Sequence, residues 1–210
     1  MGGVDAPETV EHDDVRAEAR VQPGEWVVVL GTGGVGLAAV QIATALGARV
    51  VAVSRSQDKL EQARREGAVA TVEAGDRTTE GIRDVTGRGA HVSIDALGIT
   101  ATTVPGILAL RKGGRHVQLG LTGKDEKGAI AMPVDAMVFQ ELSFHTGSGC
   151  PHTSYPGLLS MVASGALKPE RLLEKKIDVG GVNDVLGRMT DYRTSGFNVI
   201  TSWAASAAAV

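Results

Sequence analysis

The chain has 210 residues, of which 43% are hydrophobic and 21% are charged, and its formal net charge is −3. These values are typical of a soluble globular protein, and the small negative charge argues against a general nucleic-acid binder. No apolar run approaches the roughly 20 residues of a membrane span. Cys150 is the single cysteine, which excludes an internal disulfide and a multi-cysteine zinc site.

The first 20 residues differ in composition from the rest of the chain. They contain six acidic residues and two arginines, and they lack the apolar segment of a secretory signal peptide. We expect residues 1–20 to form a poorly ordered acidic leader, and we expect the protein to be cytoplasmic. His12 lies within this acidic run, which is better interpreted as a solvated segment than as a metal site.

Residues 26–36 carry the strongest functional signal. The apolar run 26–30 predicts a buried strand, and the pattern Gly31-x-Gly33-x-x-Gly36 follows it directly. In a dinucleotide site the first glycine permits the tight turn, the second lets the backbone approach a pyrophosphate, and the third lets the helix pack closely on the strand. The helix N-terminus then offers unpaired N–H groups to the phosphates. The alternative is a glycine-rich structural turn without a ligand.

The same strand-then-helix alternation continues along the chain. Apolar residues at helical spacing from Val35 to Leu46 predict a first helix that ends at Gly47, and Ser56 is a suitable N-cap for a second. Further helices are predicted over 78–86 and 100–110, and Gly113 and Gly114 are interpreted as the turn into the fifth strand. The six predicted strands cover 26–30, 49–53, 69–72, 91–96, 115–119 and 142–146. This order predicts an α/β fold with a doubly wound parallel sheet, the Rossmann fold.

The end of the second strand bears on which dinucleotide binds. NAD-binding domains place an acidic residue there to accept hydrogen bonds from the adenosine ribose. This chain has Ser54, Arg55 and Ser56 instead, and a guanidinium can hold a 2′-phosphate that an acid would repel. The residues therefore favour NADP(H) over NAD(H). The alternative is that Arg55 only projects into water.

Two rival nucleotide-binding classes fit less well. A domain that binds S-adenosylmethionine typically has an acid where Ser54 stands. A short-chain dehydrogenase needs a Tyr-x-x-x-Lys pair, but Leu159 follows Tyr155 and Gly196 follows Tyr192 at that spacing.

The pattern changes after about residue 150. A helix is predicted over 155–164 and another over 182–190, with strands over 175–179 and 197–201 that have no partner sheet in our interpretation. We divide the chain into the leader (1–20), a Rossmann domain (21–165), a helix and strand segment (166–203) and a frayed tail (204–210).

The remaining polar residues give weak signals. His91, His116 and His145 lie in or beside predicted strands and are interpreted as structural. Cys150 and His152 are too few ligands for a metal site. Asp95 ends the fourth strand, where it could either orient a loop or contact a cofactor.

From residue 21 to about residue 203 the chain resembles the medium-chain, zinc-type alcohol dehydrogenase family. The stretches that carry the resemblance are 21–27, 31–36, 38–43, 46–50, 58–60, 95–98, 113–115, 162–167 and 196–200.

The resemblance implies a cofactor site and no catalytic or metal-binding residue in this sequence. Three groups would contact the dinucleotide: one at the pyrophosphate, one at the adenosine ribose or its phosphate, and one near the nicotinamide. The pyrophosphate group is Gly31, Gly33, Gly34, Val35 and Gly36. The ribose group is Ser54, Arg55 and Lys59. The group near the nicotinamide is Ala96, Leu97, Gly98, Gly120 and Leu121. The sixth strand would be a sheet edge of the kind that this family uses to form dimers.

One departure from the family is large. Its members place a catalytic domain with Cys and His zinc ligands before this region, and residues 1–20 cannot hold that domain. We therefore expect an oxidoreductase-like domain for hydride transfer between NADP(H) and an alcohol or aldehyde that is incomplete for catalysis alone. The alternatives are a nucleotide-binding module or decayed dehydrogenase without chemistry, and, less favoured, a zinc-free reductase. The strands over 175–179 and 197–201 should then expose apolar surface.

Overall fold

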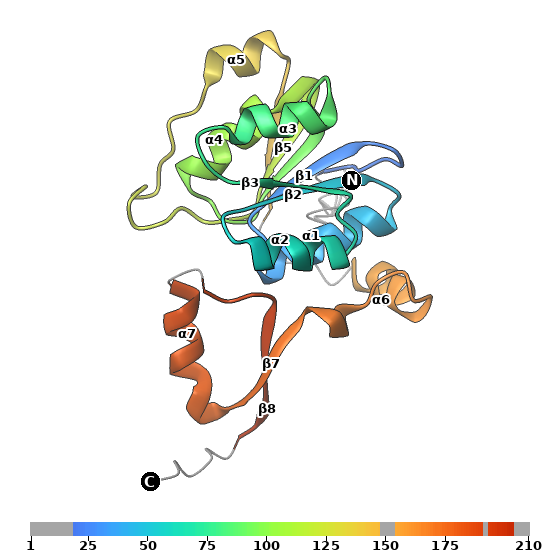
Figure 1. Cartoon of the computed structure of the whole chain (residues 1–210), viewed down its shortest axis with the longest axis vertical. Helices are drawn as coiled ribbons and strands as arrows, with labels where there is room; N and C mark the ends of the chain where they lie inside the picture. Colours follow the sequence, from blue (N-terminus) through green and yellow to red (C-terminus); the bar gives the residue numbers. More distant parts are fainter. Residues whose placement is uncertain (1–18, 148–153, 191–192, 204–210) are drawn as a thin grey trace, which may run out of the picture.

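A computed structural model describes residues 19–147, 154–190 and 193–203 (Figure 1). Six strands form the main sheet: β1 (Trp26–Leu30), β2 (Arg49–Ser54), β3 (Ala70–Glu73), β4 (Ala90–Asp95), β5 (Leu110–Gln118) and β6 (Ser143–Thr146). The helices that flank and connect them are α1 (Gly34–Ala45), α2 (Gln57–Arg65), α3 (Thr78–Thr86), α4 (Thr100–Leu108) and α5 (Val134–Phe139).

The main sheet is parallel throughout, with the strand order β3-β2-β1-β4-β5-β6. The order reverses at β1, which pairs with β2 on one side and with β4 on the other. A reversal of this kind leaves a crevice at the carboxyl edge of the sheet between the two neighbouring strands. The doubly wound α/β fold predicted from the sequence is confirmed.

Apolar side chains alternate between two core layers, one on each face of the sheet. Val27 and Val29 of β1 pack with α1 and α2 on one face, and Val28 and Leu30 pack on the opposite face with α3 and α4. Figure 1 shows the two pairs of helices on opposite sides of the sheet. Because both faces are covered, the strands read as nearly continuous apolar runs rather than as alternating ones.

The fifth strand differs from its prediction. Gly113 and Gly114 lie inside β5 rather than in a turn before it, and the pairing of β4 with β5 shifts register between Ala90 and Val92. Gly113 has a φ of 70°, a conformation suited to glycine, and its N–H donates to the carbonyl of Gln140. The strand therefore begins at Leu110 and bulges at the glycines.

The last part of the chain forms a second, smaller sheet. After α6 (Tyr155–Ala163) and the 3-10 helix η3 (Pro169–Leu172) come β7 (Leu173–Asp178), the 3-10 helix η4 (Val179–Gly181), α7 (Val182–Thr190) and β8 (Phe197–Ser202). The expectation that these two strands lack a partner is wrong, because β7 and β8 pair with each other in parallel across α7. The predicted exposed apolar surface is confirmed at Val179, Phe197, Val199 and Ile200.

This smaller sheet is fastened to α1 through the residues just before it. Leu172 is 2% exposed and packs in the same core layer as α1. The side-chain amide of Gln41 donates to the carbonyl of Lys168 at 3.0 Å and to the carboxylate of Glu66 at 2.6 Å. In Figure 1, β7, β8 and α7 lie on the side of the main sheet that α1 and α2 cover.

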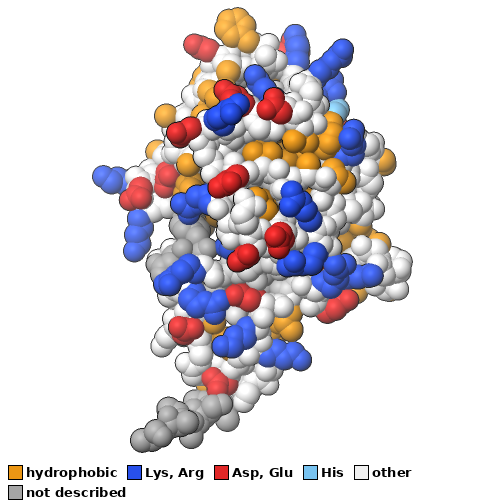
Figure 2. Space-filling model, in the orientation of Figure 1, with side chains coloured by type: hydrophobic (Ala, Val, Ile, Leu, Met, Phe, Trp, Pro, Cys, Tyr) orange, Lys and Arg blue, Asp and Glu red, His pale blue; other side chains and the backbone are white. Residues whose placement is uncertain are grey.

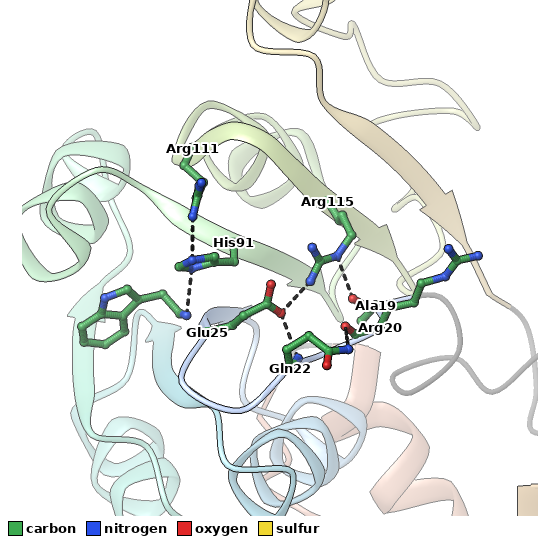
Figure 3. Close-up of polar contacts among 8 residues, drawn as sticks. Ala19, Arg20, Gln22, Glu25, His91, Arg111 and Arg115 are labelled. Carbon is green, nitrogen blue, oxygen red and sulfur yellow. Dashed lines mark hydrogen bonds and ion pairs between the residues drawn. The ribbon is translucent and has the colours of Figure 1, made fainter.

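A second polar cluster joins the start of the described chain to the amino-terminal edge of the sheet (Figure 3). Arg115 donates to the carboxylate of Glu25 at 2.6 Å and to the carbonyl of Ala19 at 2.9 Å. His91 accepts from the backbone N–H of Trp26 at 3.0 Å through Nδ1. Burial, followed by the nearby Arg111 guanidinium, lowers the pKa of His91. These contacts support a structural role for His91.

On the face shown in Figure 2, Lys and Arg side chains are interspersed with Asp and Glu, so this face presents no continuous basic patch. Within the part of the chain that is described, none of the helices is both long and apolar enough to cross a bilayer.

Candidate functional site

Two glycines in the turn from β1 into α1, Gly31 and Gly36, are required by the packing of the turn itself. Gly31 has a φ of 87°, and its N–H donates to the carbonyl of Val53 at 3.0 Å. A Cβ on Gly31 would lie 2.5 Å from Cγ of Leu97, and a Cβ on Gly36 would lie 1.8 Å from the carbonyl oxygen of Gly31. Both positions therefore exclude any larger residue on packing grounds alone.

Gly33 is different, because it faces open space. A Cβ placed there would meet no atom within 4 Å. The φ of Gly33 is −83°, which any residue can adopt, so neither packing nor backbone conformation requires glycine at this position. At the neighbouring Gly34 a Cβ would lie 2.8 Å from Cε1 of Phe197, so β8 closes that side of the turn. The open side of the glycine turn is thus the side at Gly33, where the backbone is accessible to a ligand.

The N-terminus of α1 fits an anion at this opening. Its N-cap is Gly33, which provides no side-chain cap, and its first turn contains no acidic residue. The first turn therefore presents backbone N–H groups and the positive end of the helix dipole. The adjacent Thr32 is 2% exposed, and its hydroxyl has no hydrogen-bond partner among the described residues.

The residues assigned to the adenosine end lie where β2 ends. Ser54 is buried, and its Oγ accepts from the N–H of Ser56 at 3.4 Å, while Arg55 is exposed. Lys59, in the first turn of α2, has a pKa lowered mainly by burial, with Glu174 acting to raise it and Arg55 to lower it. Arg55 and Lys59 flank the start of α2, so two cationic side chains lie at this end, with Glu174 near Lys59.

One acidic residue at this end was missed by our sequence interpretation. Glu73 pairs with Ser54 across β2 and β3, and its carboxylate accepts from the side chain of Gln57 at 3.2 Å. Our interpretation considered only the end of the second strand. The neighbouring strand end supplies the carboxylate, and only the strand register reveals it.

Asp95 organises the loop that follows β4. Its buried carboxylate accepts from the N–H of Leu97 at 2.8 Å, from the N–H of Gly98 at 3.1 Å and from the hydroxyl of Thr103 at 2.6 Å, and it also contacts Thr102. Of the two roles left open by the sequence, these contacts favour orientation of the loop, because they satisfy the carboxylate within the protein.

The loops after β4 and β5 are in direct backbone contact. A Cβ on Gly98 would lie 2.3 Å from the carbonyl oxygen of Leu121, and one on Gly120 would lie 2.3 Å from the carbonyl carbon of Leu97. The N–H of Gly120 also donates to the carbonyl of Asp95 at 2.9 Å. The Leu121 side chain itself is 90% exposed.

All the residues assigned to the cofactor therefore lie at one edge of the sheet. The glycine turn follows β1, the Ser54 group follows β2, and the two loops near the assigned nicotinamide end follow β4 and β5. This is the carboxyl edge, on both sides of the point where the strand order reverses.

A metal centre does not fit the described residues. Within 19–147, 154–190 and 193–203, no group of three or more His, Cys, Asp or Glu side chains is placed to hold a metal ion. Cys150 and His152, and also His12, lie outside these ranges. His116 is buried and contacts Ser93 and Gln118, in keeping with a structural histidine.

Comparison with known proteins agrees with this geometry. The family model described as zinc-binding dehydrogenase matches residues 34–164. This chain belongs to the zinc-binding dehydrogenase family.

Individual members of the family support the assignment. The chain is 38% identical over 167 residues to the probable D-xylulose reductase A of Emericella nidulans, in an alignment covering 74% of this chain and 44% of that protein. An alcohol dehydrogenase from the archaeon Aeropyrum pernix superimposes with a TM-score of 0.78 at 28% identity, covering 89% of this chain and 53% of that one. An NAD-dependent alcohol dehydrogenase gives a TM-score of 0.80 at 28% identity, covering 89% and 54%.

The chain spans about half the length of these relatives, or less. The residues that the family model matches run from the start of α1 to the end of α6 and include β2 to β6 of the doubly wound sheet.

Proposed function

We propose that this chain is the dinucleotide-binding part of a zinc-type alcohol dehydrogenase-like oxidoreductase. The observation that carries the proposal is the opening at Gly33, where the uncapped N-terminus of α1 meets open space at the carboxyl edge of the sheet. A pyrophosphate needs this combination of close backbone approach and unpaired N–H groups.

We propose that NADP(H) is preferred over NAD(H). Ser54 stands where NAD-binding domains carry an acid, and Arg55 is exposed with Lys59 nearby, so the local charge suits a 2′-phosphate. Glu73 beside Ser54 works in the opposite direction, because its carboxylate would repel that phosphate. The proposal gives greater weight to the two cationic side chains.

The chemistry proposed for the complete oxidoreductase is hydride transfer between this cofactor and an alcohol or carbonyl compound. A bound nicotinamide gives or takes a hydride at its ring. The relative named D-xylulose reductase makes a polyol and ketose pair the first substrate class to test. The described residues of this chain contribute cofactor binding and no metal-ligand cluster, so the alternative is a nucleotide-binding module without chemistry.

We propose three further properties of the chain. β6 is the outer strand of the sheet, and the neighbouring α5 exposes Val134, Val138 and Phe139, so we propose a homodimer through this edge.

Residues 21–165 are proposed as the Rossmann domain and 166–203 as a segment that packs on a further domain. We propose the cytoplasm as the location.

The deciding experiment is a titration of the purified chain with NADPH and with NADH, followed by nicotinamide fluorescence. We expect tighter binding of NADPH, and we expect Arg55→Ala to weaken NADPH by about tenfold while changing NADH little, because the lost contact is charge-assisted. Tighter binding of NADH would reject the NADP(H) preference and would assign the ribose contact to Glu73.

The variant Gly33→Ala separates ligand binding from folding. Its Cβ meets no protein atom and its φ is ordinary, so its unfolding free energy should stay close to that of the wild type, while the methyl group blocks the pyrophosphate. Gly187→Ala, in α7 and also without a neighbour within 4 Å, is the matched control and should bind normally. Unchanged affinity in Gly33→Ala would place the ligand elsewhere.

A further inference from the structure

A chain of polar side chains lies on the α4 face of the sheet, beneath the two loops that follow β4 and β5. Nδ1 of His116 lies 3.3 Å from the hydroxyl of Ser93, and Nε2 of His116 lies 3.2 Å from Oε1 of Gln118. The amide nitrogen of Gln118 donates to the carbonyl of Gly120 at 2.9 Å. This series of polar side chains therefore ends on the backbone of the loop after β5.

The hydrogen bond from the Gln118 amide nitrogen to the carbonyl of Gly120 fixes which groups donate and which accept along this series of side chains. Oε1 of Gln118 can only accept, so Nε2 of His116 carries the proton and Nδ1 accepts from Ser93. His116 is fully buried and stacks on Phe144 with ring centroids 5.1 Å apart, which holds the imidazole in place. Ser93, His116, Gln118 and the carbonyl of Gly120 thus form one aligned series of donors and acceptors.

The loop after β4 has a support of its own beside Gln118. The hydroxyl of Thr103 donates its proton to Asp95 at 2.6 Å, and its oxygen lies 3.2 Å from Oε1 of Gln118. Asp95 in turn accepts from the N–H groups of Leu97 and Gly98. Asp95 therefore supports the loop after β4, and Gln118 supports the loop after β5 that lies against it.

We propose that Gln118, supported by His116, is a positioning residue that holds the 96–98 and 119–121 loops in register for the nicotinamide end of the cofactor. The role rests on the proposed dinucleotide-binding function. The two loops touch through Gly98 and Gly120 with no space for a side chain, so a shift of one loop displaces the other. Among the described residues, the hydrogen bonds of Gln118 lead to His116 and to the loop after β5, and not to the glycine turn or the Ser54 end.

The variant Gln118→Met tests the role. Methionine keeps the length of the side chain and removes both hydrogen bonds, and Gln118 borders a cavity of about 190 Å³ that accommodates a flexible thioether. Two ligands are compared. The first is the dinucleotide that the wild type binds more tightly, NADPH or NADH. The second is its analogue without the nicotinamide ring, which is 2′-phospho-ADP-ribose for NADPH and ADP-ribose for NADH.

We expect Gln118→Met to bind the dinucleotide about three- to tenfold more weakly, with a smaller change in nicotinamide fluorescence, and to bind the ring-free analogue as the wild type does. Amide hydrogen exchange at residues 96–98 and 119–121 should become faster in the variant. Equal weakening of both ligands, or unchanged binding and exchange, would overturn the positioning role.

The matched control is Gln41→Met. Gln41 is a buried glutamine that, like the half-buried Gln118, has side-chain hydrogen bonds, to Glu66 and to the backbone of Lys168. It lies on α1 and supports neither loop. It should lose stability without changing nicotinamide fluorescence at saturation. A wild-type chain that binds neither the dinucleotide nor its ring-free analogue would instead reject the proposed function, and the positioning role with it.

Discussion

At the scale of single residues, the glycine turn separates into positions that packing requires and one position that it does not. Gly31 and Gly36 would bring a Cβ into close contact with protein atoms, whereas Gly33 would not. The sequence pattern already assigned the approach of a pyrophosphate to the second glycine, Gly33. The structure shows that only Gly33 has no reason inside the protein to be glycine, and this makes it the position that reports on a ligand.

Buried histidines at this scale predict how stability depends on pH. Burial is the largest influence on His116 and lowers its pKa from the ordinary 6.5, although Gln118 and Asp95 act to raise it. The unfolded chain therefore binds a proton before the folded chain does. The stability that neutral His116 contributes is present above about pH 6.5 and is lost as the pH falls below it.

We expect the unfolding free energy in urea to be lower at about pH 5.5 than at about pH 7.5, with a smaller difference in His116→Gln. His91, whose pKa is also lowered, should retain part of the dependence in that variant. An identical pH dependence in the wild type and in His116→Gln would show that His116 does not carry this effect.

At the scale of elements, the short segment before β7 fastens the smaller sheet to the main one. η3 packs against α1, and its last residue, Leu172, fills the core layer formed with α1. This anchor could not be predicted from the sequence, because the contact joins residues far apart in the chain and neither the spacing nor the composition of 167–172 marks it. The pairing of β7 with β8 was missed for the same reason.

Leu172→Ala should lower the unfolding free energy by about 2–5 kcal/mol, the usual cost of a cavity at a buried leucine. Leu186→Ala is the control, because Leu186 is exposed on α7, and it should change stability by no more than about 0.5 kcal/mol. The measurement is chemical denaturation of the two variants beside the wild type. Similar small effects in both would mean that η3 does not anchor the smaller sheet.

At the scale of the whole molecule, exposed apolar side chains lie on several elements, including α6, and two regions bear on the question of a partner. One is the edge formed by β6 and α5, and the other is the smaller sheet with α7, where Leu186, Met189 and Val199 are exposed. Exposed apolar side chains are common at interfaces, and we propose the edge of β6 and α5 as one. The strand edge adds unpaired backbone groups at β6, which favours pairing with a second copy there.

Sedimentation velocity should detect a dimer that Phe139→Lys weakens, because Phe139 on α5 is 80% exposed beside that edge. Leu159→Lys, on the exposed side of α6, introduces the same charge away from the edge and should leave the dimer intact. Loss of the dimer in Leu159→Lys but not in Phe139→Lys would move the interface from the β6 edge to α6.

The sequence by itself determined the doubly wound sheet, the glycine turn and the absence of an acid at Ser54, because each depends on local periodicity or on the chemistry of one position. Tertiary structure alone decided that Gly34 is closed by Phe197, that Glu73 lies beside Ser54, and that Gln118 bonds the loop after β5. These contacts depend on strand register and on which elements become neighbours. Register and neighbours follow from packing over the whole chain, which a single sequence does not display.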